Sequence, residues 1–493
     1  MAIDSTKTIK VDTENLRQIL SRRIASARRL VRLGNEAHFV CATVPIDCDF
    51  SLAFQLLHTG GALGRAWYWH ARGDEGQPRP VYVAVGAAMH VEAVGTDRFD
   101  RLRSIWLASK ERIVASASDT VRFFFGFSFA DVPSPTPWEK WPSAMMTLPE
   151  FVFRFEENKT VTVTVRLDED SVDDDVCETA LMDFQSVLDA SRIRNERLFH
   201  EDGSPVMPTT HRYANSSLST AKSSFTAMVS QTAEDIRHGR FAKAVMARQE
   251  YLENVNVDDV SQALLAIRQS YPYSTGFAVS HRDEYFLGAS PEILAKVQAG
   301  EVLVDCLAGT TRRGEDDAQD ELAARQLLQS TKDQSEHEVV VQAIERMTAD
   351  LATEVVRDLN RQILRLPNVS HLYSRVRGRL KDEVTLFDAA KVLHPTPAIA
   401  GYPRDVAIRV ISDREPFHRG WYAGGVGVIT PGGDGEISVA LRSALATSKG
   451  TFLYAGAGIM GDSDPEAEWN ETELKLRPMR MAFGRGEHGG SLA

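Results

Sequence analysis

The chain contains 493 residues, enough for one large domain or for two to three domains of ordinary size. Its 43% hydrophobic and 25% charged residues are typical of a soluble globular protein. The 56 basic and 68 acidic residues give a net charge of −12, which argues against a surface for nucleic acid or for anionic membranes. An anionic small substrate would therefore need a local positive site or a metal ion.

The cysteines and the N-terminal segment predict a cytoplasmic protein. No CxxC spacing of a zinc site occurs, so we expect reduced thiols at Cys41, Cys48, Cys177 and Cys306. The N-terminal segment has no apolar core of a secretion signal, and no apolar run reaches the length of a membrane span. We therefore expect no association with a membrane.

Residues 1–200 are rich in predicted strands and are expected to complete the sheets of the fold. A basic helix is predicted over 14–33, where apolar residues recur on one stripe. Strands punctuated by proline and glycine are predicted at 39–44, 81–85, 121–129, 151–155 and 161–165. Residues 201–223 are polar and rich in Ser and Thr, and we expect a connecting loop there.

Residues 224–486 mix helices with strands and hold the candidate chemical residues. Helices are predicted near 224–238, 257–270, 317–330 and 333–357. Strands are predicted near 241–248, 420–429, 436–447 and 451–459. Because helices and strands do not alternate strictly, we expect an α/β protein of the α+β type, with large antiparallel sheets.

The run 455–475 predicts a strand, a glycine turn and a capped helix. Asp464 suits the N-cap, and Pro465 suits the first turn, where a missing N–H is tolerated. The helical spacing places four polar residues on one face: Glu468, Glu471, Thr472 and Lys475. Gly456 and Gly458 allow a ligand close to the backbone. This surface suits a metal-bound anionic substrate.

Glu336 interrupts the apolar stripe of the helix predicted over 333–357. A carboxylate on a buried face needs a metal ion, an arginine or a lysine as partner. Mg²⁺ prefers one or two carboxylates with waters and substrate oxygens, so Glu336 and Glu471 would make such a site. A structural ion pair near the helix N-terminus is the alternative.

Two further residues are candidates for proton transfer. Lys243 shares a strand face with apolar residues, where a lysine can lose its proton and act as a base. Its alternative is a lysine that extends from a strand end to solvent. Glu292 lies at a bend beside an apolar run and could serve as a general acid. Its alternative is an ordinary acidic residue of a surface turn.

A proline loop and an arginine complete the candidates. His394 begins the rigid segment HPTPA, which ends at Ala398. A lone histidine is also compatible with a structural role. Arg442 stands in a predicted apolar strand and could bind a carboxylate through two hydrogen bonds, or form a cross-strand ion pair.

In chain order, the motifs resemble those of the chorismate-utilising enzymes, and among them the isochorismate synthases. They span about 240–485 and read FAKAVMAR, FLGASPEIL, LAGTTRRG, KDQSEHEVV, LHPTPAIAGYP, WYAGGVG, VALRSAL and YAGAGI. The resemblance implies a single large domain, with antiparallel sheets flanked by helices around a deep site. It also implies Mg²⁺, chorismate as substrate, and a reversible conversion to isochorismate.

The resemblance also implies a role for each candidate. Lys243 would activate water for attack on ring C2, and Glu292 would protonate the departing C4 hydroxyl. Glu336 and Glu471 would bind Mg²⁺, with Glu468 acting through water. The remaining residues would hold or line the substrate: Gly309, Thr310, His394, Ala398, Tyr422, Arg442, Gly456, Gly458 and Lys475.

Departures from related sequences separate the branches of the family. Ala308 stands where aminodeoxychorismate synthases with a covalent nucleophile carry Lys. Anthranilate synthase component I usually ends its last motif differently, and salicylate synthases usually depart from HPTPA. We therefore expect an isochorismate synthase, with salicylate synthase and then anthranilate synthase component I as the alternatives within the family, and a non-catalytic homologue as an alternative of another class. A monomer is expected, and the menaquinone, siderophore and salicylate pathways all remain open.

Overall fold

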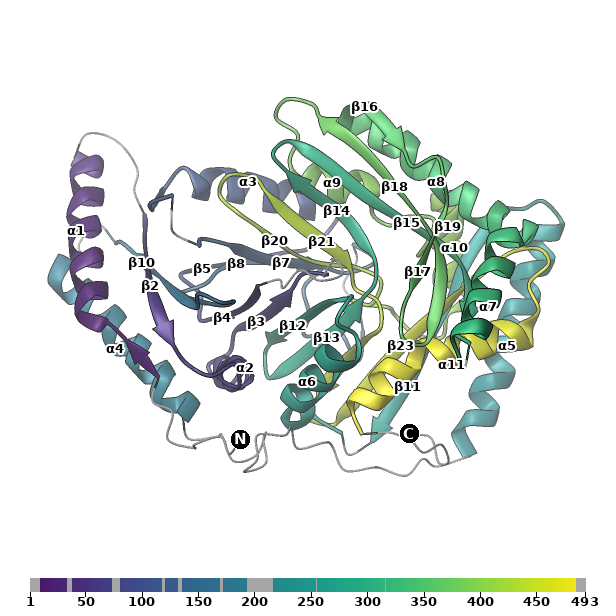
Figure 1. The fold of residues 1–493 in the computed structure, drawn as a ribbon, viewed down its shortest axis with the longest axis horizontal. Helices are drawn as coiled ribbons and strands as arrows, with labels where there is room; N and C mark the ends of the chain where they lie inside the picture. The colour runs from purple at the N-terminus through teal and green to yellow at the C-terminus, as the bar shows by residue number, and fades with distance from the viewer. Residues whose placement is uncertain are drawn as a thin grey trace.

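A computed structural model describes residues 9–32, 38–72, 80–117, 120–131, 135–168, 172–192, 216–253, 255–314 and 316–484. Two large sheets, antiparallel except for one pair of strands, form its centre, and helices pack against both (Figure 1). This architecture confirms the predicted α+β class. None of the helices in these ranges combines the length and the apolar character needed to cross a membrane.

The larger sheet has 13 strands within the described ranges. In spatial order they are β1 Lys10–Val11, β2 Phe39–Asp47, β10 Thr160–Arg166, β9 Phe151–Phe155, β4 Val81–Val85, β3 Ala66–His70, β12 Thr275–His281, β13 Glu284–Ser290, β22 Ser443–Thr447, β23 Gly450–Ile459, β11 Lys243–Glu253 and β19 Gly401–Tyr402, with β6 Ile113–Val114 beside β2. The parallel pair is β2 with β6.

The smaller sheet has 10 strands in the same ranges. In spatial order they are β16 Ala352–Arg357, β18 Val369–Leu380, β15 Glu301–Arg312, β14 Ile293–Gln298, β21 Gly435–Val439, β20 Gly425–Ile429, β7 Phe123–Phe127, β8 Ala144–Leu148 and β5 Met89–Ala93, with β17 Gln362–Arg365 beside β18.

The helices pack against these sheets and against one another. They are α1 Thr13–Arg32, α2 Leu52–Ala62, α3 Arg98–Lys110, α4 Asp173–Arg192, α5 Ser216–Arg237, α6 Val260–Ser270, α7 Asp317–Gln329, α8 Thr331–Leu351, α9 Leu386–Leu393, α10 Arg404–Arg414 and α11 Pro465–Ala482, with a 3₁₀ turn at Val257–Asp259. Helices α8 and α11, which supply the candidate metal ligands, contact β15 and β23 respectively.

Both sheets join the N-terminal part of the chain to the C-terminal part. In the larger sheet β3 pairs with β12, so that Trp69 lies opposite Phe277. In the smaller sheet β7 pairs with β20, so that Phe125 lies opposite Gly427. Side chains alternate across β3, because Trp67 and Trp69 enter one core cluster and Tyr68 enters the other. Each of the two core clusters therefore contains residues from both parts of the chain.

Three sequence expectations differ from the structure. The predicted helix 333–357 ends at Leu351, and residues 352–357 form β16 because they pair with β18. The expected loop 201–223 is already helical from Ser216 onward, and its earlier residues lie outside the described ranges. Arg442 does not lie inside a strand, because its φ of +47° separates β21 from β22.

Leu445→Ala should strongly destabilise the protein. Leu445 is fully buried in β22 between Phe286 and Phe452 of the adjacent strands. A buried Leu→Ala change costs about 2–5 kcal/mol because the cavity collapses only partly. The midpoint of urea unfolding measures the loss. Leu359→Ala is the matched control, since Leu359 is 94% exposed and should change the free energy of unfolding by less than about 0.5 kcal/mol.

Candidate active site

A cavity of about 530 Å³ lies among β11, β15, β18, β23, α8 and α11. All the predicted site residues except His394 line it: Lys243, Glu292, Gly309, Thr310, Glu336, Ala398, Tyr422, Arg442, Gly456, Gly458, Glu468, Glu471 and Lys475. The first and the last of these residues, Lys243 and Lys475, are more than two hundred positions apart in the sequence. The fold thus brings the candidate residues together in one place.

His394 is the exception, and the expectation that it lines the substrate is corrected. Its imidazole is enclosed by the rings of Phe99, Phe127 and Phe129. Nε2 lies 2.9 Å from the carbonyl oxygen of Phe129. Burial, with Arg98 nearby, lowers the pKa of His394 to about 3, so the ring is neutral. His394 therefore serves the packing behind the proline loop, whereas Ala398 of the same loop lines the cavity.

Lys243 and Glu336 form a buried ion pair at the start of β11. Nζ of Lys243 lies 2.7 Å from Oε1 of Glu336, and the lysine side chain is 1% exposed. Both residues approach the backbone of Gly458, where a Cβ atom would lie 2.7 Å from Oε1 and 3.0 Å from Cε of Lys243. A larger residue at position 458 would therefore force the ends of these two side chains to shift.

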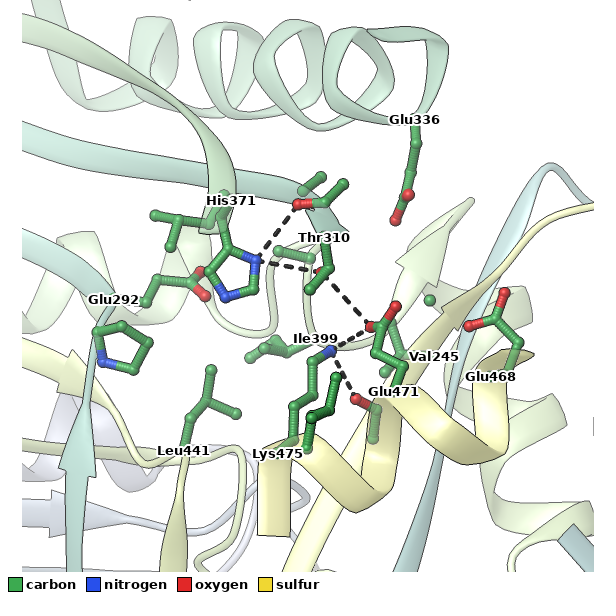
Figure 2. Close-up of a pocket in the computed structure, with 18 of the residues that line it drawn as sticks. Val245, Glu292, Thr310, Glu336, His371, Ile399, Leu441, Glu468, Glu471 and Lys475 are labelled. Atoms are coloured by element: carbon green, nitrogen blue, oxygen red, sulfur yellow. Dashed lines mark hydrogen bonds and ion pairs between the residues drawn. The ribbon is translucent and has the colours of Figure 1, made fainter. Parts of the chain in front are cut away.

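The face predicted for the last helix is present on α11. The side chain of Asp464 caps the helix by accepting a hydrogen bond from the N–H of Ala467. Lys475 Nζ contacts Oε1 of Glu471 at 2.6 Å and donates to the carbonyl oxygen of Gly456 at 2.9 Å. Figure 2 shows Lys475 beside Glu471, with Glu468 nearer the start of the same helix. Of the four residues expected on one face, Glu468, Glu471 and Lys475 line the cavity, whereas the buried Thr472 accepts a hydrogen bond from Nε of Arg248 and does not line it.

Glu468 and Glu292 are both buried carboxyls whose pKa values are raised. Burial, followed by repulsion from Glu471, raises the pKa of Glu468 to about 7. The hydroxyl of Ser463 donates to Glu468 Oε1 at 2.7 Å. Burial, followed by the negative charge of Asp305, raises the pKa of Glu292 to about 8. Glu292 Oε1 has no hydrogen-bond partner among the described residues, so this carboxyl is available to a ligand.

His371 was missed by the sequence reasoning. It comes from β18, lines the cavity, and its Nδ1 lies 3.1 Å from Oγ1 of Thr310. Its Nε2 lies 3.4 Å from Nη2 of Arg442. Burial, with the charge of Arg442 nearby, holds the pKa of His371 well below its usual range, so the ring is neutral. The alternation of β18 offers no signal, because its face holding His371 also carries Tyr373, Arg375 and Arg377.

A positive φ also occurs on the cavity wall at Gly309, where it serves a bulge. The φ of Gly309 is +77°, and the pairing of β15 with β18 shifts register there, between Ala308 and Thr310. A Cβ at Gly309 would lie 3.0 Å from Cβ of Asp333. The bulge turns the following residue so that Thr310 Oγ1 reaches Oε1 of Glu471 at 3.5 Å.

The family model for "Chorismate binding enzyme" matches residues 25–484. The chain belongs to the chorismate-binding enzymes. It is 33% identical over 418 residues to the salicylate biosynthesis isochorismate synthase of Pseudomonas aeruginosa, a match that covers 84% of each chain. It is 36% identical over 252 residues to the isochorismate synthase MenF of Bacillus subtilis, which covers 50% of this chain and 53% of that protein.

Solved structures share the fold of this chorismate-binding enzyme. The menaquinone-specific isochorismate synthase MenF from Escherichia coli has a TM-score of 0.72 at 24% identity, covering 93% of this chain and 99% of that chain. Anthranilate synthase component I from Streptococcus pneumoniae has a TM-score of 0.67 at 21% identity, covering 83% and 93%. The predicted family and fold are thereby confirmed.

The donor set in the cavity fits a hard divalent cation. Glu336, Glu468 and Glu471 supply oxygen atoms alone, as Mg²⁺ prefers. Among the described residues, the three-residue group whose ligand atoms lie within 4.8 Å of one another is elsewhere, at His90, Glu92 and His281. In that group, Nη1 of Arg65 lies 2.7 Å from Nε2 of His90, so the guanidinium of Arg65 occupies the space beside this nitrogen.

Gly458→Ala should weaken chorismate binding. The added Cβ would lie at the cavity wall, 2.7 Å from Glu336 Oε1 and 3.0 Å from Lys243 Cε, and the ends of these two side chains would have to shift within the binding cavity. Overpacking of this kind costs about 1–3 kcal/mol, and if this cost falls on the bound state the affinity drops by about 5- to 150-fold. Titration calorimetry with chorismate measures it. Gly432→Ala is the control, since its Cβ meets only Thr430 Oγ1, at 3.7 Å; equal affinities for both variants would contradict the prediction.

Proposed function

We propose that the protein is an isochorismate synthase, a Mg²⁺-dependent isomerase that converts chorismate reversibly to isochorismate. One observation carries the proposal: a buried lysine and a buried carboxyl with a raised pKa line the same cavity as three further carboxylates. Relatives named isochorismate synthase support the choice within the family.

Lys243 and Glu292 divide the proton transfers of this isomerisation. Water is a weak nucleophile, so Lys243 acts as the base that takes a proton from the water whose oxygen bonds to ring C2. Hydroxide is a poor leaving group, so Glu292 gives a proton to the C4 hydroxyl, which departs as water. The ring double bonds shift between these positions. Since the pKa of Glu292 is raised to about 8, it carries the required proton at neutral pH.

Glu336 and Glu471 would hold Mg²⁺ directly, and Glu468 would act through a water molecule. When bound, Mg²⁺ supplies charge neutralisation at the ring carboxylate and fixes its position. The carboxylates of Glu336 and Glu471 also contact Lys243 and Lys475. The same two carboxylates thus balance the charge of both lysines in the cavity.

The remaining cavity residues would bind the anionic groups and the ring. Arg442 and Lys475 are the cations placed to meet the carboxylates of chorismate. The others would supply hydrogen bonds or surface: Gly309, Thr310, Ala398, Tyr422, Gly456 and Gly458. Residues 224–486 would carry the catalytic region, and residues 1–200 would complete the sheets. We further propose a monomer that acts in the cytoplasm.

Product analysis tests the function. The protein is incubated with chorismate and MgCl₂, and the products are separated by chromatography. Isochorismate as the sole product would support the proposal. Salicylate with pyruvate would assign a salicylate synthase, and anthranilate formed on addition of ammonia would assign an anthranilate synthase. Absence of turnover with bound chorismate would indicate a non-catalytic homologue.

Lys243→Ala should abolish isochorismate formation and preserve Mg²⁺-dependent chorismate binding. Removal of a general base typically costs about 10²–10⁴-fold in rate. Steady-state assays and titration calorimetry measure the two properties separately. Lys391→Ala is the control, because Lys391 pairs with Asp100 on the surface. An unchanged kcat in Lys243→Ala would remove the assignment of the base.

Glu471→Gln should raise the Mg²⁺ concentration needed for half-maximal activity by about tenfold or more, since one ligand charge is lost. The measurement is a Mg²⁺ titration of initial rate at saturating chorismate. Glu466→Gln serves as the control on the same helix, because Glu466 is exposed and pairs with Lys222. The ligand assignment fails when both variants give the wild-type titration.

A further inference from the structure

A buried ion pair, Arg72 with Asp305, lies behind the cavity. Nη1 of Arg72 contacts Oδ2 of Asp305 at 2.7 Å, and their side chains are 7% and 0% exposed. Tyr373 joins the pair, since its hydroxyl donates to Asp305 Oδ1 at 2.8 Å. Neither Arg72 nor Asp305 lines the cavity. Arg72 comes from the segment after β3, in the part of the chain that the sequence motifs leave unassigned.

Both members of the pair bind the backbone beside Glu292. Nη1 of Arg72 donates to the carbonyl oxygen of Pro291 at 2.8 Å. Oδ2 of Asp305 accepts from the N–H of Ile293 at 3.1 Å. The carbonyl oxygen of Glu292 itself accepts from the N–H of Val439 at 3.0 Å. The main chain at Glu292 is therefore fixed on both sides, whereas its side chain is left to the cavity.

Asp305 also acts on the Glu292 carboxyl through its charge. After burial, the negative charge of Asp305 is the main cause that raises the pKa of Glu292. Positive groups oppose it from three other elements: Arg442 before β22, Lys243 of β11 and Lys475 of α11. Two neutral titratable groups also belong to this surrounding: His371 of β18 and Cys306 of β15.

We propose that Arg72 and Asp305 are positioning residues for the Glu292 general acid, fixing its backbone and placing one negative charge behind its carboxyl. This inference rests on the proposed function. A pair of this kind contributes little to stability that well-packed apolar side chains could not supply, because both charges lose their hydration. The role of the pair therefore lies in its contacts with the backbone on both sides of Glu292.

Two substitutions should move the pH dependence of turnover in opposite directions. In the wild type, kcat/KM should fall as pH rises through about 8, because Glu292 must carry a proton. Asp305→Asn removes the negative charge and leaves Arg72 unopposed, so this fall should move to lower pH by about 1 unit. Arg72→Gln removes the nearer of the two cations beside Asp305 and leaves Arg375, whose Nε lies 3.8 Å from Oδ1, so the fall should move to higher pH by up to about the same amount.

Opposite shifts separate positioning from mere destabilisation, which would lower kcat/KM without moving the profile. Arg28→Gln and Asp173→Asn are the matched controls, because these residues form a pair with a 2.9 Å contact on the outer helices. Shifts of the same sign in both test variants, or no shift, would overturn the proposal. Should both variants fail to fold, Tyr373→Phe decides, since it removes only the hydroxyl that donates to Asp305 and should move the fall to higher pH.

A second measurement does not depend on turnover. In protein labelled with ¹³C at glutamate carboxyls, the Glu292 resonance is assigned by its loss in Glu292→Gln and followed with pH. Its midpoint should shift down in Asp305→Asn and up in Arg72→Gln. Absence of isochorismate from the wild type would refute the proposed function, and the resonance would still test the pair. Turnover with an unmoved resonance would refute the pair alone.

Discussion

The antiparallel pairing of β11 with β23 is the constraint on which the cavity depends. It sets Val245 opposite Gly458 and Ala247 opposite Gly456, so the strand beside Lys243 carries no side chain at two positions. The missing side chains let helices α8 and α11 bring charged groups against the sheet. Glu336 reaches Lys243 from one helix, and Lys475 reaches the Gly456 carbonyl from the other.

Charge balance explains why so many ionised groups can share one cavity. Each buried charge is costly unless it is paired, and the pairs present here are lysine with glutamate. A divalent cation and a dianionic substrate together add no net charge. Under the proposed function, the carboxylates can therefore turn to the cation while the ammonium groups turn to the substrate or the attacking water. An acidic protein can bind an anion in this way.

Local patterns in the sequence predicted the features that depend on nearby residues of the chain, such as helix caps and the spacing of side chains along a helix. The Asp464 cap is present as predicted, and helical spacing also brings Glu468, Glu471 and Lys475 to the cavity, although it does not bring Thr472 there. Residues 352–357 were predicted to be helical because the pattern continued, yet pairing with β18 determines their conformation. No local signal links Lys243 with Glu336, or Arg72 with Asp305, because these contacts form only when distant strands and helices pack.

Each sheet pairs strands from the N-terminal part of the chain with strands from the C-terminal part, and this limits which fragments of the protein can fold alone. A fragment that began after residue 215 would lack β3 and β7, the partners of β12 and β20. Each sheet would then expose a long, apolar edge with unpaired backbone groups, which is a template for aggregation. The C-terminal half, which carries the sequence motifs, is thus not expected to fold as an independent domain. Recombination between relatives should instead place crossovers in loops and exchange matched strands from both halves together.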